Sequence, residues 1–142
     1  MTENTKQRAT RTRRWAALLV ALGAVLVGLL TGTGTASAAT YNGVCGSGYG
    51  VKDQHSITGG TIFLTYSGST GNNCVVTIRN TSGTAIYMDA FVRLTGALNW
   101  NDDPGYWTTY AGPVYVHAPG RCIDWGGSIG SVTWAQYNSH CG

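Results

Sequence analysis

The chain has 142 residues and a formal net charge of +3, but this charge is unevenly distributed. Residues 1–14 hold five basic side chains and one acid, whereas residues 39–142 hold four basic residues, five Asp and no Glu, a net charge of −1. The basic character therefore belongs to the N-terminal segment, which argues against nucleic-acid binding by the remainder. The length suits one small domain rather than two.

The N-terminal segment is typical of a secretory signal peptide. Basic residues precede an uncharged apolar run, residues 15–30, and Ala36-Ser37-Ala38 supplies the small side chains of a cleavage site. The apolar run of 16 residues is shorter than the roughly 20 that a membrane-spanning helix needs. We expect residues 1–38 to be the signal peptide, with cleavage after Ala38 or Ala39. Residues 39–142 are then a single secreted β domain, with no membrane association in its mature form.

The composition of residues 39–142 predicts an all-β fold. Gly supplies 17 of these 104 residues, Glu is absent and Lys occurs once, which disfavours helices and favours strands and tight turns. Strands are expected at 61–67, 74–80, 84–94, 106–110, 114–118, 121–125 and 131–137, with Gly112-Pro113 and Gly126-Gly127 as breaks between strands. We predict a small antiparallel β-sandwich or barrel of seven or eight short strands with two disulfides.

Two segments illustrate how the pattern is interpreted. In residues 84–94, apolar side chains alternate with Tyr87, Asp89, Phe91 and Arg93, as in a half-buried strand. Residues 52–55, Lys-Asp-Gln-His, contain only polar side chains and indicate an exposed segment.

All four cysteines lie after the leader, at positions 45, 74, 122 and 141, and indicate a disulfide framework in an exported domain. Three pairings are possible. We predict Cys45–Cys74 and Cys122–Cys141, because each link would tie a chain end to an apolar strand. The cross pairing, Cys45–Cys122 with Cys74–Cys141, would require those strands to be adjacent. A zinc site is disfavoured because the spacings of zinc motifs are missing.

Residues 99–105, Asn-Trp-Asn-Asp-Asp-Pro-Gly, gather four oxygen-bearing side chains and are the one candidate calcium loop. The same residues are those of an ordinary turn, which is the interpretation we favour. No nucleophile motif is present, and the carboxylates Asp89 and Asp124 would face each other as in a glycosidase only by accident of folding. We therefore expect no enzyme activity, cofactor or metal.

Aromatic residues are the most informative excess, with 14 in residues 39–142. Trp125 and Trp134 are expected in the core. The remaining cluster is a possible binding surface, because rings with a polar edge stack on sugars and populate protein interfaces; its members are Trp100, Tyr106, Trp107, Tyr110 and Tyr115.

Several segments together resemble the spore-associated protein A family of mycelial, spore-forming actinobacteria. They are residues 40–46 (TYNGVCG), 73–79 (NCVVTIR), 110–116 (YAGPVYV), 122–127 (CIDWGG) and the closing 140–142 (HCG). The resemblance covers essentially the whole domain after the leader. It implies location on aerial hyphae and spores, and brings no active-site residues with it.

We therefore expect an exported, non-enzymatic protein of the spore or aerial-hypha surface, whose partners are spore or cell-wall components. The alternative is a secreted glycan-binding module or protease inhibitor that uses an exposed aromatic loop at 99–110.

Overall fold

The computed structural model describes residues 37–142, an all-β unit with nine strands and no helix. The predicted signal peptide lies almost entirely outside the described residues and stays a prediction. The strands are β1 Gly50–Ile57, β2 Gly60–Ser67, β3 Asn72–Arg79, β4 Ile86–Leu94, β5 Asn101–Asp102, β6 Gly105–Trp107, β7 Tyr110–His117, β8 Ile123–Ile129 and β9 Val132–Ser139. None of the described residues forms a helix long and apolar enough to cross a membrane.

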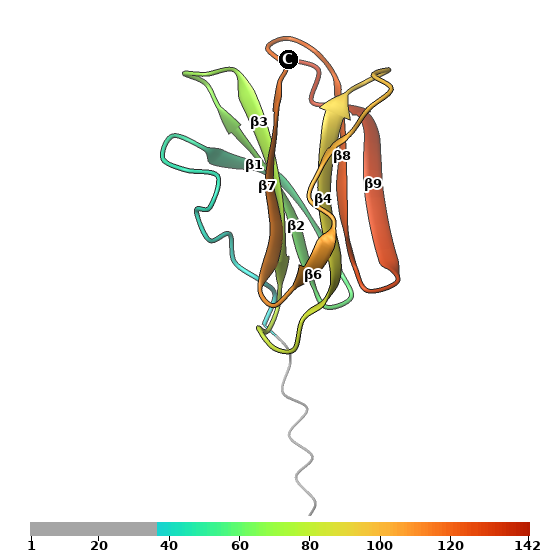
Figure 1. Cartoon of the computed structure of the whole chain (residues 1–142). Helices are drawn as coiled ribbons and strands as arrows, with labels where there is room; N and C mark the ends of the chain where they lie inside the picture. Colours follow the sequence, from blue (N-terminus) through green and yellow to red (C-terminus); the bar gives the residue numbers. More distant parts are fainter. Residues whose placement is uncertain (1–36) are drawn as a thin grey trace, which may run out of the picture. The chain divides into compact units, whose positions relative to one another are not determined.

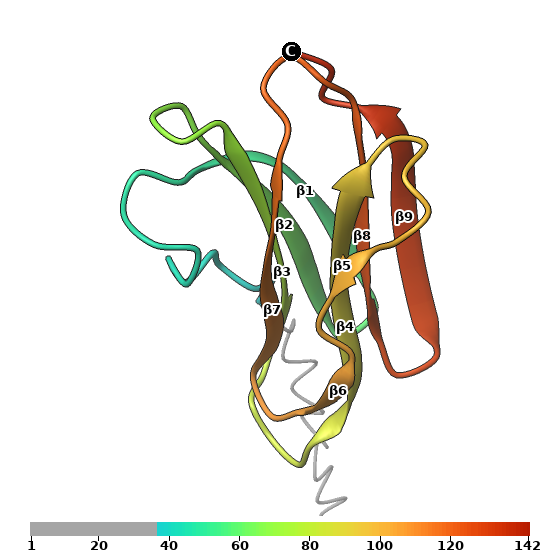
Figure 2. The same cartoon turned by 45° about the horizontal axis from the view of Figure 1, so that its top comes forward.

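The strands form two antiparallel sheets that pack face to face (Figure 1). One sheet has the order β1-β2-β3-β7, and the other has the order β5-β4-β8-β9 with β6 also paired to β4. Figure 2 shows β5 and β6 lying beside β4, at the edge of the second sheet. The all-β sandwich is thus confirmed, and the barrel alternative is not the one adopted. It has nine strands rather than the predicted seven or eight, because β1 and the two-residue β5 were not expected.

The main core lies between the sheets. It is built from the inward-facing side chains that strand alternation predicts: Ile62, Leu64, Val75, Met88, Ala90, Val92, Ala111, Val114, Ala118, Ile123, Trp125 and Ile129. Trp125 is fully buried, and the Trp134 ring packs against it with ring centres 5.0 Å apart. Both tryptophans therefore serve the core, as expected.

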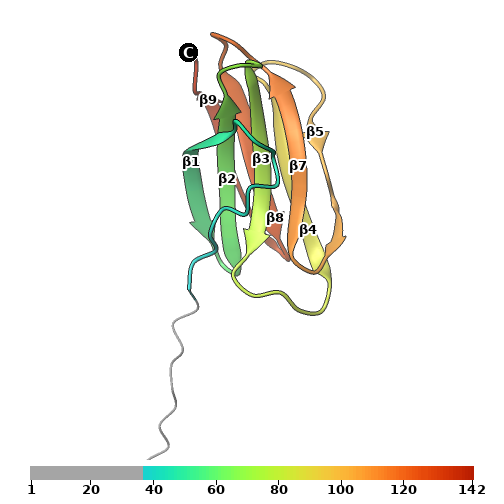
Figure 3. The same cartoon turned by 90° about the vertical axis from the view of Figure 1, so that its left-hand side faces the viewer.

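A second apolar cluster lies on the outer face of the β1-β2-β3-β7 sheet, where Phe63, Val76 and Ile78 are buried. The segment that precedes β1 crosses this face and covers it (Figure 3). The Cys45–Cys74 disulfide attaches this segment to β3. The second disulfide, Cys122–Cys141, joins the start of β8 to the residues after β9. Both predicted pairings are confirmed.

The strands differ from those predicted in three places. Residues 50–57 form the edge strand β1, which was not predicted; its side chains are mostly exposed, as expected for 52–55, because backbone pairing with β2 needs no apolar side chains. Strand β7 runs through Gly112-Pro113 with a bulge opposite β3. Gly112 has φ of +91° and approaches the Val75 carbonyl oxygen, so a Cβ there would lie 2.7 Å from that oxygen. Strand β8 runs through Gly126-Gly127, where Phe91 of β4 occupies the space on one face and Thr77 of the opposite sheet occupies it on the other.

Candidate functional site

An open groove lies on the outer face of the sheet that contains β4, β8 and β9. Alternation along β4 directs Asp89 and Phe91 away from the core. Gly126 of β8 pairs with Phe91, and Ala135 of β9 pairs with Gly126. The Phe91 ring fills the space above Gly126, and the small side chain of Ala135 beyond it leaves the surface lower on the β9 side.

The groove has a volume of about 280 Å³ and takes its lining from β4, β5, β9 and the segment before β5. The lining residues are Asp89, Phe91, Trp100, Asp102, Thr133, Ala135 and Tyr137. Three of the seven are aromatic and two are carboxylates. A mostly flat, ring-lined surface with a few polar groups is typical of a site for carbohydrate or another extended ligand.

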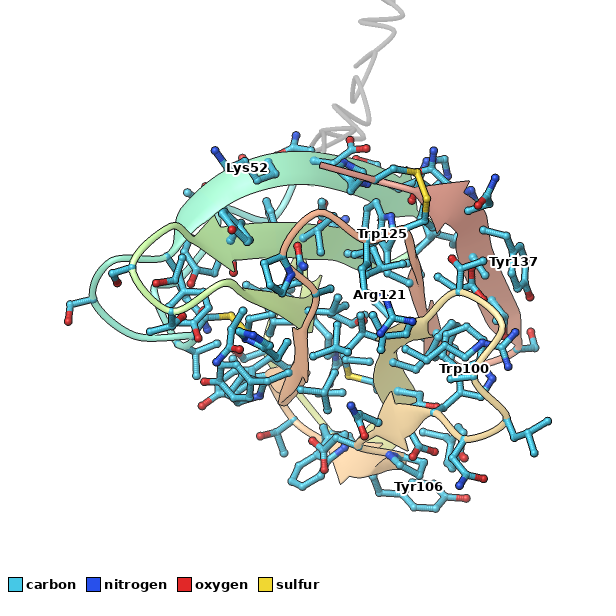
Figure 4. The ribbon with its side chains drawn as sticks, turned by 90° about the horizontal axis from the view of Figure 1, so that it is seen from above. Lys52, Trp100, Tyr106, Arg121, Trp125 and Tyr137 are labelled. Atoms are coloured by element: carbon cyan, nitrogen blue, oxygen red, sulfur yellow. A yellow bond between two sulfur atoms is a disulfide. The ribbon has the colours of Figure 1, made fainter. Side chains whose placement is uncertain are left out.

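Trp100 is the central ring of the groove. Its ring meets Phe91 edge-on with centres 4.9 Å apart, and Tyr137 edge-on with centres 6.4 Å apart. The guanidinium of Arg93 lies 4.1 Å from the centre of the Trp100 ring, as in a cation–π contact. In Figure 4, Trp100 and Tyr137 lie on the same outer side of the ribbon, whereas Trp125 lies between the sheets.

Arg93 is fixed by a buried carboxylate. Its Nε donates to Asp124 Oδ2 at 2.8 Å, while Asp124 Oδ1 accepts from the Thr95 hydroxyl at 2.7 Å and the Asn138 backbone N–H at 2.9 Å. Burial alone would raise the pKa of Asp124, but these hydrogen bonds and the Arg93 charge lower it overall. Asp124 is therefore a structural anion that positions Arg93, and through it Trp100.

Asp89 has the opposite electrostatic environment. Burial, together with the charges of Asp102 and Asp103, raises its pKa from 3.8 to about 6, although its Oδ1 accepts a hydrogen bond from the Asp103 N–H at 3.1 Å. A carboxyl whose pKa is displaced by desolvation in a groove marks a candidate functional position. This residue distinguishes the groove from ordinary sheet surface.

A second cavity of about 280 Å³ lies at one end of the sandwich, lined by Lys52, Tyr66, Asn73, Ala118, Gly120, His140 and Gly142. It contains a single aromatic ring, and Lys52 Nζ lies 5.9 Å from the centre of that Tyr66 ring. The groove combines more rings with a perturbed carboxyl, so it is the better candidate.

The five aromatic residues selected from the sequence do not form one surface. Trp100 lies in the groove, and Tyr106 is 74% exposed on β6, where its ring meets Tyr87 edge-on at 5.7 Å. Trp107 packs against the main core, and its Nε1 donates to the Asp103 carbonyl at 3.2 Å. The strand expected over 106–110 is interrupted, because β6 ends at Trp107 and residues 108–109 form a bend.

The other two members lie on β7, in the other sheet, and contact the residues on its outer face. Tyr110 packs against the second apolar cluster. Tyr115 contacts Tyr49 edge-on at 5.7 Å, and its hydroxyl donates to the Cys45 carbonyl at 3.2 Å. Both therefore help to hold the segment before β1 rather than extend the groove.

Sequence reasoning missed Asp89, Phe91 and Tyr137 as site residues. The alternation in 84–94 already placed Asp89 and Phe91 on one outward face, so a signal for these two was present. Tyr137 carried no such signal, because it meets Trp100 only through the path of the loop after β4.

The candidate calcium loop uses its polar groups internally. The Asn101 side-chain amide donates to the Tyr115 carbonyl at 2.8 Å, and Asp103 Oδ2 accepts from the Gly112 N–H at 2.7 Å. Asn101, Asp102 and Gly105 also belong to strands paired with β4. These bonds account for the loop as a structural element.

The chain is 50% identical over 133 residues to spore-associated protein A from Streptomyces coelicolor, an alignment that covers 89% of this chain and 86% of that protein. No family model matches the chain. No solved structure matches it either.

Proposed function

Because the chain belongs to the spore-associated protein A family, we propose that it is an exported, non-enzymatic protein of the spore or aerial-hypha surface. The name of the relative supports association with spores. Two disulfides suit an oxidising, extracellular location. The leader-like segment at 1–38 supports secretion, and the net charge of −1 over residues 39–142 gives no support for nucleic-acid partners.

The mode of attachment that we propose is binding of a surface polysaccharide in the groove. The observation that carries this proposal is the set of three rings, from Phe91, Trp100 and Tyr137, on an exposed sheet face. Rings stack on the apolar faces of sugars, while nearby polar groups hydrogen-bond the hydroxyls. The glycan-binding alternative and the surface-protein expectation thereby become one proposal.

The protease-inhibitor alternative receives less support. An inhibitor of that kind needs a protruding loop at 99–110, but Asn101–Asp102 and Gly105–Trp107 pair with β4 as strands. Exposed side chains of 99–110, such as Tyr106 at 74%, are therefore carried by short paired strands rather than by a protruding loop. Leu98, which is 93% exposed, lies just before this region.

The test uses Tyr137→Ala, which removes an exposed groove wall, and Leu98→Ala as the matched control outside the groove. Purified mature protein is mixed with isolated spore walls, and the bound fraction is measured against wall concentration. We expect Tyr137→Ala to bind roughly tenfold more weakly, from the loss of one stacked ring, and Leu98→Ala to bind like the wild type. Equal binding by all three proteins would refute the groove as the attachment site.

The non-enzymatic part is tested on the same material. Spore walls and their soluble polysaccharides are incubated with the protein, and released reducing ends are measured over time. We expect no release above the level seen with an Asp89→Asn variant. Release that this substitution abolishes would replace the binding proposal with a glycosidase.

A further inference from the structure

We propose that the ligand of the groove is a linear polysaccharide whose sugars carry free amino groups, and that it lies along β4. This inference rests on the proposed function and specifies the chemistry of its ligand. It is carried by the order of side chains along β4 and by the charges that face the groove.

The order of side chains supports a linear ligand. Tyr87, Asp89 and Phe91 occupy alternate positions of β4 and therefore project from the same face. Tyr87 and its neighbour Tyr106 form one exposed ring pair, and Phe91 with Trp100 forms another. Four residues of strand separate the two pairs, a distance of about 13 Å. An extended chain of several sugars would contact both pairs and pass over Asp89 between them.

The charges support a cationic ligand. Among residues 37–142, Asp89 and Asp102 both line the groove and no basic side chain does. The nearest guanidinium, that of Arg93, is engaged by Asp124 at 2.8 Å. An ammonium group on the ligand would offset one of the two negative charges, and hydrogen bonds between charged partners are about twice as strong as neutral ones.

The surroundings of Asp89 define how this attraction depends on pH. From the segment after β4, Asp102 and Asp103 face it, and both charges raise its pKa. From β8 and β9 its neighbours across the sheet are Ser128 and Thr133, which carry no charge. The attraction requires a protonated amine on the ligand and an ionised Asp89. Affinity should therefore be highest at a pH between the pKa of Asp89 and the pKa of the amine. It should fall below about pH 6, because Asp89 is then protonated.

A sugar polymer is favoured over a basic peptide because ring pairs lie at β4 on both sides of Asp89, the Tyr87–Tyr106 pair and the Phe91–Trp100 pair. Flat rings suit the apolar faces of pyranoses, whereas a flexible Lys or Arg chain loses more conformational entropy when it is ordered on the rings and carboxylates. A basic peptide is therefore included as a competing probe.

The test compares a glucosamine hexamer with its fully N-acetylated form by titration calorimetry. Both ligands are added to wild type, Asp102→Asn, and Asp53→Asn as a control carboxylate on β1 of the other sheet. We expect the wild type and Asp53→Asn to prefer the amino form by about tenfold, and Asp102→Asn to lose most of that preference. Thermal melting of each variant confirms that it is folded.

Results other than the expected one distinguish failure of the amino-sugar inference from failure of the proposed function. Equal affinity for both hexamers would overturn the amino-sugar inference and leave glycan binding standing. Binding of neither hexamer, nor of intact spore walls, would overturn the proposed function itself. Tighter binding of a Lys-rich peptide than of the glucosamine hexamer would overturn the inference in favour of a protein partner.

Discussion

The substitution Gly126→Ala tests whether the groove depends on the absence of a side chain in the middle of β8. A Cβ at this position would lie 2.5 Å from Phe91 Cε2 and would also meet the Trp134 backbone oxygen of β9 at closer range. The first neighbour is a ring that could turn away. The second is part of the β8–β9 ladder and cannot move without disturbing that pairing.

The expected cost follows from these two contacts. Forcing an extra methyl group into a filled site costs about 1–3 kcal/mol, and the backbone contact places Gly126→Ala near the upper limit. Replacing Gly by Ala also restricts the unfolded chain, which returns about 0.4–1 kcal/mol. The net loss in the free energy of unfolding is therefore about 2 kcal/mol, equivalent to a fall in Tm of roughly 8–15 °C.

The assay is urea unfolding followed by Trp fluorescence, with Gly68→Ala as the matched control. A Cβ at Gly68 meets no atom within 4 Å, so this control should be as stable as the wild type or slightly more stable. Because Phe91 must move to admit the methyl group, Gly126→Ala should also bind spore walls more weakly. The reasoning would be refuted if both glycine variants unfolded at the same urea concentration.

Three further predictions concern the carboxylates and the disulfides. Asp89 has a folded-state pKa of about 6 against an ordinary 3.8, so its ionisation destabilises the fold as pH rises through this window. Asp89→Asn should therefore raise Tm, measured by calorimetry, at pH 7.5 and leave it unchanged at pH 3. An equal shift in Tm at both pH values would contradict this. Asp124→Asn should lower the free energy of unfolding by about 2 kcal/mol. This loss is smaller than that expected for a fully buried ion pair, because Arg93 is 22% exposed. The substitution should also release the Trp100 ring, which Arg93 holds. Loss of Trp100 restraint is checked by fluorescence anisotropy, and unchanged stability would count against the anchoring role of Asp124. Removing Cys45–Cys74 or Cys122–Cys141 by paired Ala substitutions should each cost about 3–4 kcal/mol, for sequence separations of 29 and 19. Only the first removal should expose the outer cluster to a hydrophobic dye and the segment before β1 to protease; similar exposure in both variants would be the contrary result.

The sequence predicted those parts of the fold in which the alternation of apolar and polar residues matches the burial of their side chains. Alternation in 84–94 identified both faces of β4, because one face is apolar and the other is not. The disulfide pairing followed from the need to hold two chain ends against apolar strands. Strand β1 was missed because an edge strand exposed on most positions requires no apolar pattern.

The groove escaped prediction for a different reason, which lies in the relation between strands. Gly126-Gly127 has the composition of a turn, and only the register with β4 shows that Phe91 occupies the space above Gly126. Trp100 and Tyr137 are far apart in sequence and meet because the loop after β4 folds over the sheet. No local pattern encodes such a meeting.

The location of the groove on strands rather than on a loop has a functional consequence. Phe91 is set by the β4 backbone, and Trp100 is held by Arg93, which Asp124 fixes in turn. A site supported in this way is already arranged before a ligand arrives, so little ordering cost opposes binding. At about 280 Å³ it nevertheless lies at the small end of ligand sites and would contact only a few sugars at once. Weak binding by each site is sufficient on a polymer that repeats the same motif, because a molecule that dissociates meets another copy of the ligand at high local concentration. Retention on a spore wall should therefore be much stronger than the affinity for a short oligosaccharide.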